Sequence, residues 1–425
     1  MLNIQVRGEY CYAACGEGGV RIYDVAFIDH KGFSERILTA PVSPLGQKFY
    51  VKTKFATDIA APTTIAPDPT RTHQPENHEQ PVHAMYGYIY ATDFHEGLIL
   101  IAVGTLLDGN PLNNFVKKDV VFNPGGLLQG SKSVTIFGTY AYVCCNAGLV
   151  VVSIADPEHP FVTSVTGADL LHNPKAIEMQ FRYGFLLDDD GLKVFDVTVP
   201  SEPKLTSSLP LEEHSHNLYI ARTYAYIAGG RTGLIIVDVK DPTSPRIDQI
   251  YNAHGEINDL HDVKLGITYT SEFAYLADGK NGLRVVQLTS PHTPGSSGFS
   301  PRPTPELVAT FKIPKGGEAL CVSEGVDRDR AIDESGNQIA VFGRVGAGPL
   351  SLVDQHRMYL RPNGSPWTVF DAPRDWAIPD ARSREIDLHS RIADFYGPSL
   401  HPAVRNFRRQ HSENASPVEG RPVGP

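Results

Sequence analysis

The sequence has no long hydrophobic run and no excess of positive charge. No stretch of 18 apolar residues occurs, and Met1–Val6 lacks the basic and apolar segments that begin an export signal. We therefore expect no transmembrane segment, and no signal peptide is visible. Lys and Arg number 38 against 48 Asp and Glu, for a net charge of -10 at pH 7. Because nucleic-acid binding requires cations that neutralise phosphates, DNA and RNA are not expected partners.

Cysteine is scarce and lacks the spacing of a metal or haem site. The five cysteines contain no C-x-x-C and no C-x-x-C-H motif. Covalent c-type haem and a thiolate zinc site are therefore excluded, and we expect free cysteines in strands. The adjacent Cys144 and Cys145 would point to opposite faces of a strand, which argues against a disulfide between them.

Motifs of nucleotide and acyl chemistry are missing as well. Neither a Walker loop nor a G-x-S-x-G elbow occurs, and Gly16–Gly19 fits a hairpin turn rather than a dinucleotide-binding junction. Glycine and proline are abundant instead, with 38 and 33 of 425 residues in a chain that is 41% hydrophobic. This globular composition with frequent turns predicts short strands rather than long helices.

A repeated unit organises the sequence. Six copies align on a turn glycine, with steps of 78, 51, 43, 42 and 49 residues between Gly19, Gly97, Gly148, Gly191, Gly233 and Gly282. Each copy has an aromatic-rich run, a glycine turn and a β-branched run, as in Tyr224–Val239, which predicts a two-stranded hairpin. Turns with two prolines follow four copies. Because proline cannot donate to a ladder, these turns mark where the second hairpin strand ends.

Each copy also has a strand before the hairpin and another after the proline turn, such as Leu218–Ala221 and Ile247–Ile250. Four antiparallel strands in about 42 residues make one propeller blade. The predicted fold is all-β: a single β-propeller over residues 1–353, seven-bladed, with six clear blades and a divergent seventh beginning at Ala319. Because Ile4–Val6 matches a first strand, ring closure requires the last blade to meet the N-terminal strand.

The copies at Val150–Ile154 and Ile235–Val239 resemble the LVIVD repeat family, and the match extends from about Ile4 to Val353. The resemblance implies a β-propeller. Relatives in this family have poorly defined functions; longer ones are exported or surface proteins, and some occur beside multihaem cytochromes. The resemblance therefore implies an extracytoplasmic or cell-surface location and a protein partner, either a multihaem cytochrome or another surface protein. The residues of this chain do not themselves indicate a location.

Two regions depart from the repeat. The 78-residue step predicts a long inserted loop at about 31–82, and its segment 60–75 is too proline-rich for helix or sheet. We expect this loop to be either a partner-binding arm or a flexible spacer. Residues 354–425 form a C-terminal extension that contains ten Arg and no Lys from Gln355 onward.

The extension is expected to be helical and irregular. A short helix is predicted at about 381–396, where Leu388, Ile392, Phe395 and Tyr396 share one face. That face would dock on the propeller or bind a partner. The last dozen residues are expected to be disordered.

Several histidines lie just before or within the predicted innermost strands, which would surround the central channel: His83, His172, His214, His216 and His261. Imidazoles from different blades could converge on copper, zinc or iron, with His83, His216 and His261 as ligands. We favour a polar channel lining, because His216 and His261 align with Lys132 and Lys175 of other blades rather than with further histidines.

Carboxylates crowd two turn-like stretches, Asp188–Gly191 and Asp327–Asn337. Calcium needs six to eight oxygen ligands, and neither stretch has the spacing of a known calcium loop. Turn chemistry explains both, since Asp, Asn and Gly tolerate left-handed backbone. Calcium is the alternative.

The sequence favours a non-catalytic scaffold or interaction protein, with no catalytic residue and no cofactor predicted. A propeller supplies a rigid body with two loop faces, which suits binding of a protein partner. The alternative is a propeller metalloenzyme, an oxidoreductase with a transition metal held by the channel histidines.

Overall fold

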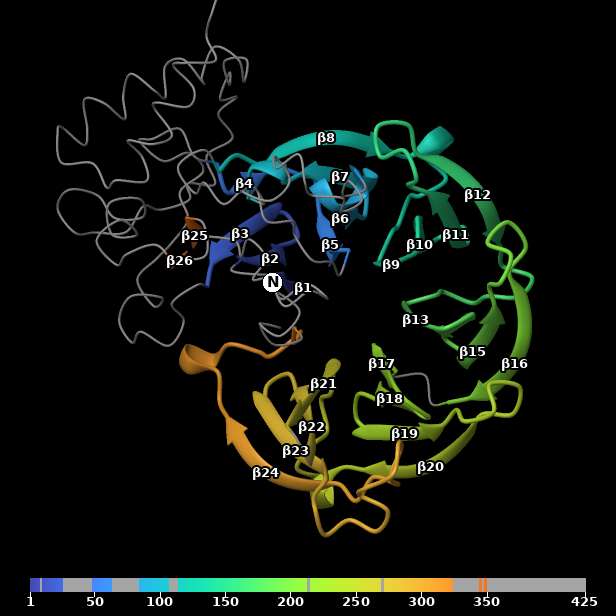
Figure 1. Ribbon diagram of the computed structural model, residues 1–425, viewed down its shortest axis with the longest axis vertical. Coiled ribbons are helices and arrows are strands. Elements are labelled where there is room, and N and C mark those ends of the chain that lie inside the picture. The colour runs from blue at the N-terminus through green and yellow to red at the C-terminus, as the bar shows by residue number, and fades with distance from the viewer. Residues whose placement is uncertain are drawn as a thin grey trace, which may run out of the picture.

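Six four-stranded antiparallel sheets surround a central channel in the computed structural model (Figure 1). The structure describes residues 1–7, 10–25, 48–62, 84–106, 114–211, 215–268, 271–323, 344–345 and 348–349. In each sheet the strands follow one another in chain order, with the first at the channel and the fourth at the perimeter. The chain is therefore an all-β, six-bladed propeller over the described residues.

The strands of the six blades have the following bounds: blade 1, β1 (Asn3–Arg7), β2 (Tyr10–Ala14), β3 (Val20–Asp24) and β4 (Tyr50–Val51); blade 2, β5 (Ala56–Ala60), β6 (Tyr88–Asp93), β7 (Gly97–Ala102) and β8 (Lys117–Phe122); blade 3, β9 (Ser133–Phe137), β10 (Tyr140–Cys145), β11 (Gly148–Ser153) and β12 (Phe161–Thr166); blade 4, β13 (Ala176–Gln180), β14 (Tyr183–Leu187), β15 (Gly191–Asp196) and β16 (Lys204–Pro210); blade 5, β17 (Leu218–Ala221), β18 (Tyr224–Ala228), β19 (Leu234–Asp238) and β20 (Arg246–Tyr251); blade 6, β21 (Asp262–Thr268), β22 (Ser271–Ala277), β23 (Leu283–Thr289) and β24 (Glu306–Phe311). Outside the blades lie a two-residue pair, β25 (Arg344–Val345) and β26 (Gly348–Pro349), and single 3-10 turns: η1 (Ala84–Gly87), η2 (Gly104–Leu106), η4 (Pro124–Gly126), η5 (Ala253–Gly255) and η6 (Pro314–Gly316).

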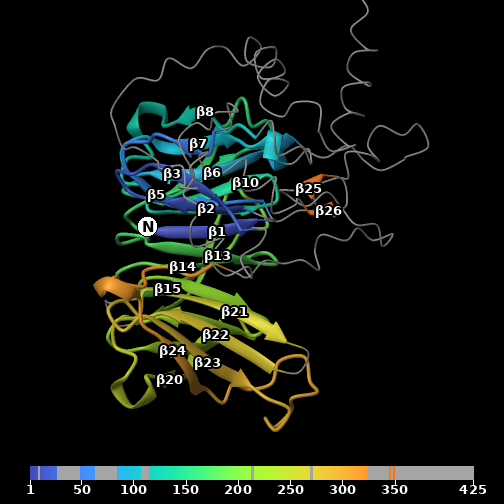
Figure 2. The same ribbon diagram turned by 90° about the vertical axis from the view of Figure 1, so that its left-hand side faces the viewer.

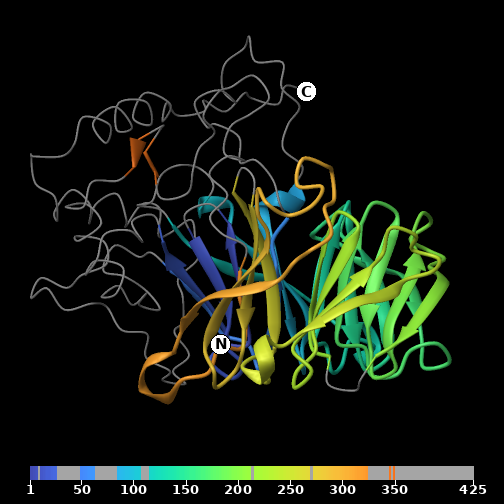
Figure 3. The same cartoon turned by 90° about the horizontal axis from the view of Figure 1, so that it is seen from below.

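The strands run between two opposite faces of the ring (Figures 2 and 3). We call one the hairpin face, where the second and third strands of each blade are joined, at 15–19, 94–96, 146–147, 188–190, 229–233 and 278–282. We call the other the proline face. There the first strand meets the second, at 138–139, 181–182 and 222–223, and proline turns join the third strand to the fourth, at 154–160, 197–203 and 239–245.

The periodic glycines are explained by the hairpin turns. Gly148 has φ 117°, and a Cβ built on it would lie 1.9 Å from the carbonyl oxygen of Thr166 in the neighbouring strand. Gly191 has φ 134° and a Cβ there would lie 2.4 Å from the oxygen of Leu209. Only glycine combines this backbone conformation with this close approach. The repeat is therefore visible in the sequence because each blade needs the same turn.

The apolar core lies between the blades. All six residues of β11 are buried, whereas β20 on the perimeter has no buried residue. Five clusters of buried residues fill the interfaces between successive blades from blade 1 to blade 6. The third strand of each repeat is therefore rich in apolar residues, and in β11 it is buried along its whole length, because both of its faces are covered.

The gap between blade 6 and blade 1 is bridged by Ala319–Ser323. Gly279 pairs with Ala319, as Gly230 of blade 5 pairs with Leu260 before β21. The N–H of Val322 then donates to Asp262 Oδ2 at 2.9 Å, and the N–H of Val6 donates to Ser323 Oγ at 2.8 Å. This short segment therefore occupies the place of a first strand between β21 and β1.

The structure corrects or leaves open several expectations. Seven blades were expected, whereas the described residues form six, and most of the predicted seventh lies outside the described residues. The prediction of a single inserted loop at 31–82 was wrong, because β4 and β5 lie within that range. The sequence did not reveal them because both strands are short and the polar Asp58 interrupts the apolar pattern of β5. The predicted helix at 381–396 lies outside the described residues, which contain no α-helix. In the described residues, no helix has the length and apolarity to cross a membrane.

Candidate functional site: the central channel

The position of the predicted histidines is fixed by a repeated backbone hydrogen bond. Lys132, Lys175, His216 and His261 each donate their N–H to the carbonyl of a residue in the adjacent second strand of the same blade, at 2.8 to 2.9 Å. The four residues therefore occupy one equivalent position in blades 3 to 6, where the first strand begins at the hairpin face. They surround one mouth of the channel.

The structure brings two of the three proposed metal ligands together. The rings of His216 and His261 are stacked with centroids 4.9 Å apart, and His261 Nε2 lies 3.3 Å from Asp259 Oδ1. His83 and His214 lie outside the described residues. Within the described ranges no group of three or more His, Cys, Asp or Glu side chains is arranged to hold a metal ion.

One residue further into the channel, two buried aspartates join neighbouring blades. Asp58 Oδ1 accepts from the N–H of Ile59 and Oδ2 accepts from the N–H of Val134 in blade 3, both at 2.8 Å. Asp262 repeats this arrangement with Val263 and Val322, and also accepts from Asn217 Nδ2 at 2.7 Å. Each carboxylate therefore satisfies backbone donors of two first strands, which face the channel without a further strand to pair with.

These carboxylates are costly to ionise. Burial raises the pKa of Asp58 to about 7, against the pull of the Val134 and Ile59 N–H groups and the Lys264 charge. Burial also raises the pKa of Asp262, and Lys264 is the largest opposing influence. Charged groups removed from water disfavour their ionised form unless a partner compensates. The donors of the channel therefore only partly offset the cost of ionising these two carboxyl groups.

A second tier of polar side chains lies deeper in the channel. Lys264 Nζ is 3.4 Å from Glu178 Oε1, which joins blade 6 to blade 4 across the channel, and it lies 5.3 Å from the centre of the Tyr219 ring. A pocket of about 180 Å³ opens between the tiers. Its polar and charged lining comes from all six blades and the bridging segment: Asn3, Gln5, Asp58, Ser133, Thr135, Glu178, Asn217, Lys264 and Ser323.

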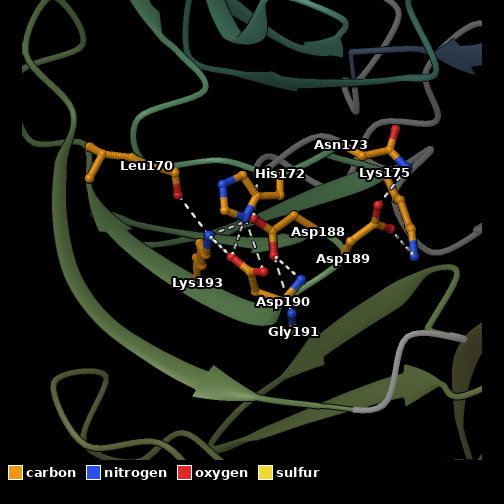
Figure 4. A network of polar contacts seen from close by, with 9 residues as sticks. All are labelled: Leu170, His172, Asn173, Lys175, Asp188, Asp189, Asp190, Gly191 and Lys193. Carbon is orange, nitrogen blue, oxygen red and sulfur yellow. Dashed lines mark hydrogen bonds and ion pairs between the residues drawn. The ribbon is translucent and has the colours of Figure 1, made fainter.

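Asp188–Gly191 forms a hairpin turn with paired carboxylates (Figure 4). Asp188 accepts from Lys193 Nζ at 2.6 Å and from the N–H groups of Asp190 and Gly191. Asp190 also pairs with Lys193 at 2.8 Å, and Lys193, followed by the His172 ring, holds the pKa of Asp190 below its usual value.

Asp189, in the same turn, pairs with Lys175 at 2.9 Å. Asp188 therefore bonds to a cation and to turn N–H groups, whereas Asp189 and Asp190 each pair with a lysine. The second acidic stretch, Asp327–Asn337, lies outside the described residues.

Cys144 and Cys145 are free thiols on opposite faces of β10. Cys144 packs with residues of blade 4 and Cys145 with residues of blade 2. Burial raises the pKa of Cys144 to about 12, so its thiol stays protonated at neutral pH. The expectation that neighbouring side chains diverge in a strand is confirmed.

The proline face exposes large aromatic side chains. Phe181 is 79% exposed and Phe299 is 76% exposed, and the Arg222 guanidinium lies 5.8 Å from the centre of the Phe299 ring. Phe181 has φ 53° in the two-residue turn between the first and second strands of blade 4. The equivalent turn residues are Gly138 in blade 3, with φ 58°, and Arg222 in blade 5, with φ 55°. A bulky residue in the left-handed region is an outlier where glycine would be unstrained. Strained backbone of this kind gathers at functional positions.

The channel residues other than the histidines escape detection in the sequence. Asp58, Glu178 and Lys264 come from blades 2, 4 and 6 and share no local motif. The one available signal is a polar residue immediately before a buried β-branched or leucine residue, as in Asp58-Ile59, Asn217-Leu218 and Asp262-Val263. It becomes visible only after the first strands are aligned.

Comparison with known proteins finds the LVIVD repeat at three places. The family model matches residues 130–165, 214–253 and 267–296, which fall on blades 3, 5 and 6. No curated protein matches the chain. Among the solved structures that are similar to the chain, two have low sequence identity to it. The computationally designed Ika8 protein is 8% identical with a TM-score of 0.43, covering 75% of this chain and 76% of that one. The β-propeller domain of Myceliophteria thermophila Cps50 (Swd1) is 11% identical with a TM-score of 0.48, covering 76% and 90%.

Proposed function

Because the chain belongs to the LVIVD repeat family and folds into propeller blades, we propose that it is a non-catalytic scaffold that binds another protein. The observation that carries this proposal is the proline face, where Phe181 is exposed in a strained turn and Phe299 stands beside Arg222. Aromatic and arginine side chains dominate the energetics of protein interfaces. Because the blades are rigid, binding a partner through these side chains does not require the backbone of the blades to become ordered.

The proposed partner is a multihaem cytochrome or another surface protein, and the proposed location is outside the cytoplasm. Both rest on the family resemblance. Location is tested by fractionating the native host and exposing intact cells to protease. Protein found in the envelope or surface fraction, and degraded by the protease, supports the proposal, whereas protein confined to the cytoplasmic fraction contradicts it.

Partner binding is tested with three tagged proteins incubated with envelope extract of the host. These are the wild type, the double variant F181S/F299S on the proline face, and F311S as the control. Phe311 is 60% exposed but lies at the hairpin-face end of β24, so the control removes the same side chain elsewhere. Bound material is cross-linked, separated and stained for haem, and bands are identified by mass spectrometry.

The wild type and F311S are expected to retain one defined partner that F181S/F299S loses. A haem-stained band identifies that partner as a cytochrome. Equal retention by all three proteins, or no partner with the wild type, would overturn the assignment of the proline face as the binding surface.

A second candidate function is a metalloenzyme with a transition metal at the channel mouth. The stacking of His216 and His261 favours it, with His83 as the third ligand. Elemental analysis of the purified protein is then expected to find one transition metal per chain that is lost in H216A/H261A and kept in H292A, an exposed histidine in a turn. Protein that contains no stoichiometric transition metal rules this function out.

A seventh blade over residues 319–353 is part of the same proposal, because Ala319–Ser323 already bridges β21 and β1. Hydrogen exchange of the full chain tests it. Slow exchange in peptides covering 319–342 supports a seventh blade, and exchange at the rate of an unstructured peptide contradicts it.

A further inference from the structure

The pocket in the central channel is large enough for a small molecule. Its volume of about 180 Å³ compares with a cavity of roughly 150 Å³ that holds benzene. It differs from such a cavity in its lining, which contains carboxylate, ammonium, amide and hydroxyl groups from blades far apart in the sequence. Pockets with a few convergent polar groups are the usual ligand sites of proteins.

We propose that this pocket binds a small organic cation with several N–H donors, of the alkylammonium or guanidinium class. Asp58 and Glu178 line the pocket against a single cation, Lys264, and Asp262 stands behind Asn217 in the wall. When Asp58 is ionised, the pocket lining has one carboxylate more than it has cations, and one positive charge on a ligand would balance it. The pocket volume admits a ligand of about the size of benzene and excludes a peptide or a nucleotide.

The hydrogen-bonding groups suit such a ligand. Each oxygen of Asp58 accepts one backbone N–H and keeps a further lone pair for a second donor. The oxygens of Ser133, Thr135 and Glu178 line the same space. Because a carboxylate accepts two parallel N–H bonds from a planar guanidinium, a guanidinium fits this set of acceptors well.

The ionisation behaviour of the pocket supports the same class of ligand. The titratable groups near Asp58 are Asp262 and Lys264 on β21, Glu178 on β13, Cys144 on β10 and Cys321 in the bridging segment. With these neighbours the pKa of Asp58 is raised to about 7, chiefly by burial. A bound cation would favour the carboxylate. Binding is therefore coupled to release of a proton below pH 7.

The experiment is isothermal titration of the full-length protein with methylguanidinium chloride. N-methylurea is the neutral compound of the same shape, and sodium chloride at equal ionic strength controls for screening. We expect methylguanidinium to bind at least tenfold more tightly than N-methylurea. Its affinity should rise by up to about tenfold per pH unit between pH 5 and 7 and level off above, since one proton is released. Titration in buffers of different ionisation enthalpy measures that proton in the wild type directly.

Three variants test the residues. D58N should lose the pH dependence, E178Q should weaken binding at least threefold, and D241N, an exposed turn aspartate on the proline face, should leave binding unchanged. If D58N does not fold, E178Q and the proton count in the wild type decide the outcome. Equal binding of the charged and neutral compounds, no proton release at pH 6, or an unaltered pH profile in folded D58N would overturn the proposal. None of these results depends on a protein partner, so failure of the cation-binding proposal would leave the proposed scaffold function unaffected.

Discussion

Asp58 should make the stability of the protein fall as pH rises from 4 to 7. Its carboxyl group is buried in the channel wall, and burial raises its pKa from 3.8 to about 7. The folded protein therefore binds this proton more tightly than the unfolded chain does. The corresponding stabilisation is fully present below pH 3.8 and is lost progressively as pH rises through the folded-state pKa.

The magnitude follows from the displacement of the pKa. At 1.36 kcal/mol per pKa unit, a rise from 3.8 to about 7 corresponds to a decrease in the free energy of unfolding on the order of 4 kcal/mol between low and high pH. This is a large part of the stability of a typical domain, about 5–15 kcal/mol. The effect should therefore be measurable against the titration of the other carboxylates.

Urea unfolding of the wild type and of D58N at pH 4.5, 5.5, 6.5 and 7.5 isolates the contribution. D58N loses the bond to the Val134 or Ile59 N–H at every pH, so a constant offset is expected. In addition to this offset, the free energy of unfolding of the wild type minus that of D58N should fall steadily as pH rises toward 7. A difference that stays flat or rises with pH would refute the burial argument.

Three other substitutions have expected outcomes. G148A should destabilise the protein by at least about 3 kcal/mol in urea unfolding, because its Cβ would overlap the carbonyl of Thr166; a loss below 1 kcal/mol would contradict the turn geometry. F181G should leave the thermal midpoint unchanged or raise stability by up to about 1 kcal/mol, because glycine suits φ 53°; a clear loss would show that Phe181 packs on the propeller. K193M should cost about 3–5 kcal/mol in urea unfolding, because it leaves the buried Asp188 carboxylate without its ammonium partner. K193R keeps the positive charge and should lose less stability than K193M; an equal loss in the two variants would contradict the ion pair.

The blades could be predicted from the sequence because their signals are local. A glycine such as Gly148 is required by a turn within one hairpin, and the strands beside it are neighbours in the chain. The proline turns likewise mark strand ends without reference to the rest of the fold. These features repeat, so each copy supports the assignment of the others.

The channel site could not be predicted in the same way, because it is assembled from residues separated by whole blades. Asp58 and Lys264 line one pocket although about 200 residues separate them. Tyr50–Val51 forms a strand of only two residues, which no periodicity can reveal. The repeat alignment gave His216 and His261 equivalent positions in two blades, but it did not predict that their rings stack. The carboxylates that lie one residue further into the channel could not be predicted without knowing the register of the first strands.

The arrangement of distant blades around one channel is tested most directly by spin-label distances on the hairpin face. Labels at Glu17 in blade 1 and at either Asp189 in blade 4 or Lys280 in blade 6, in a chain whose native cysteines are replaced, give two distances by pulsed electron resonance. A ring predicts that blade 6 lies nearer to blade 1 than blade 4 does, despite its greater separation in sequence. A distance that instead grows from blade 4 to blade 6 would mean an open array, with no shared channel.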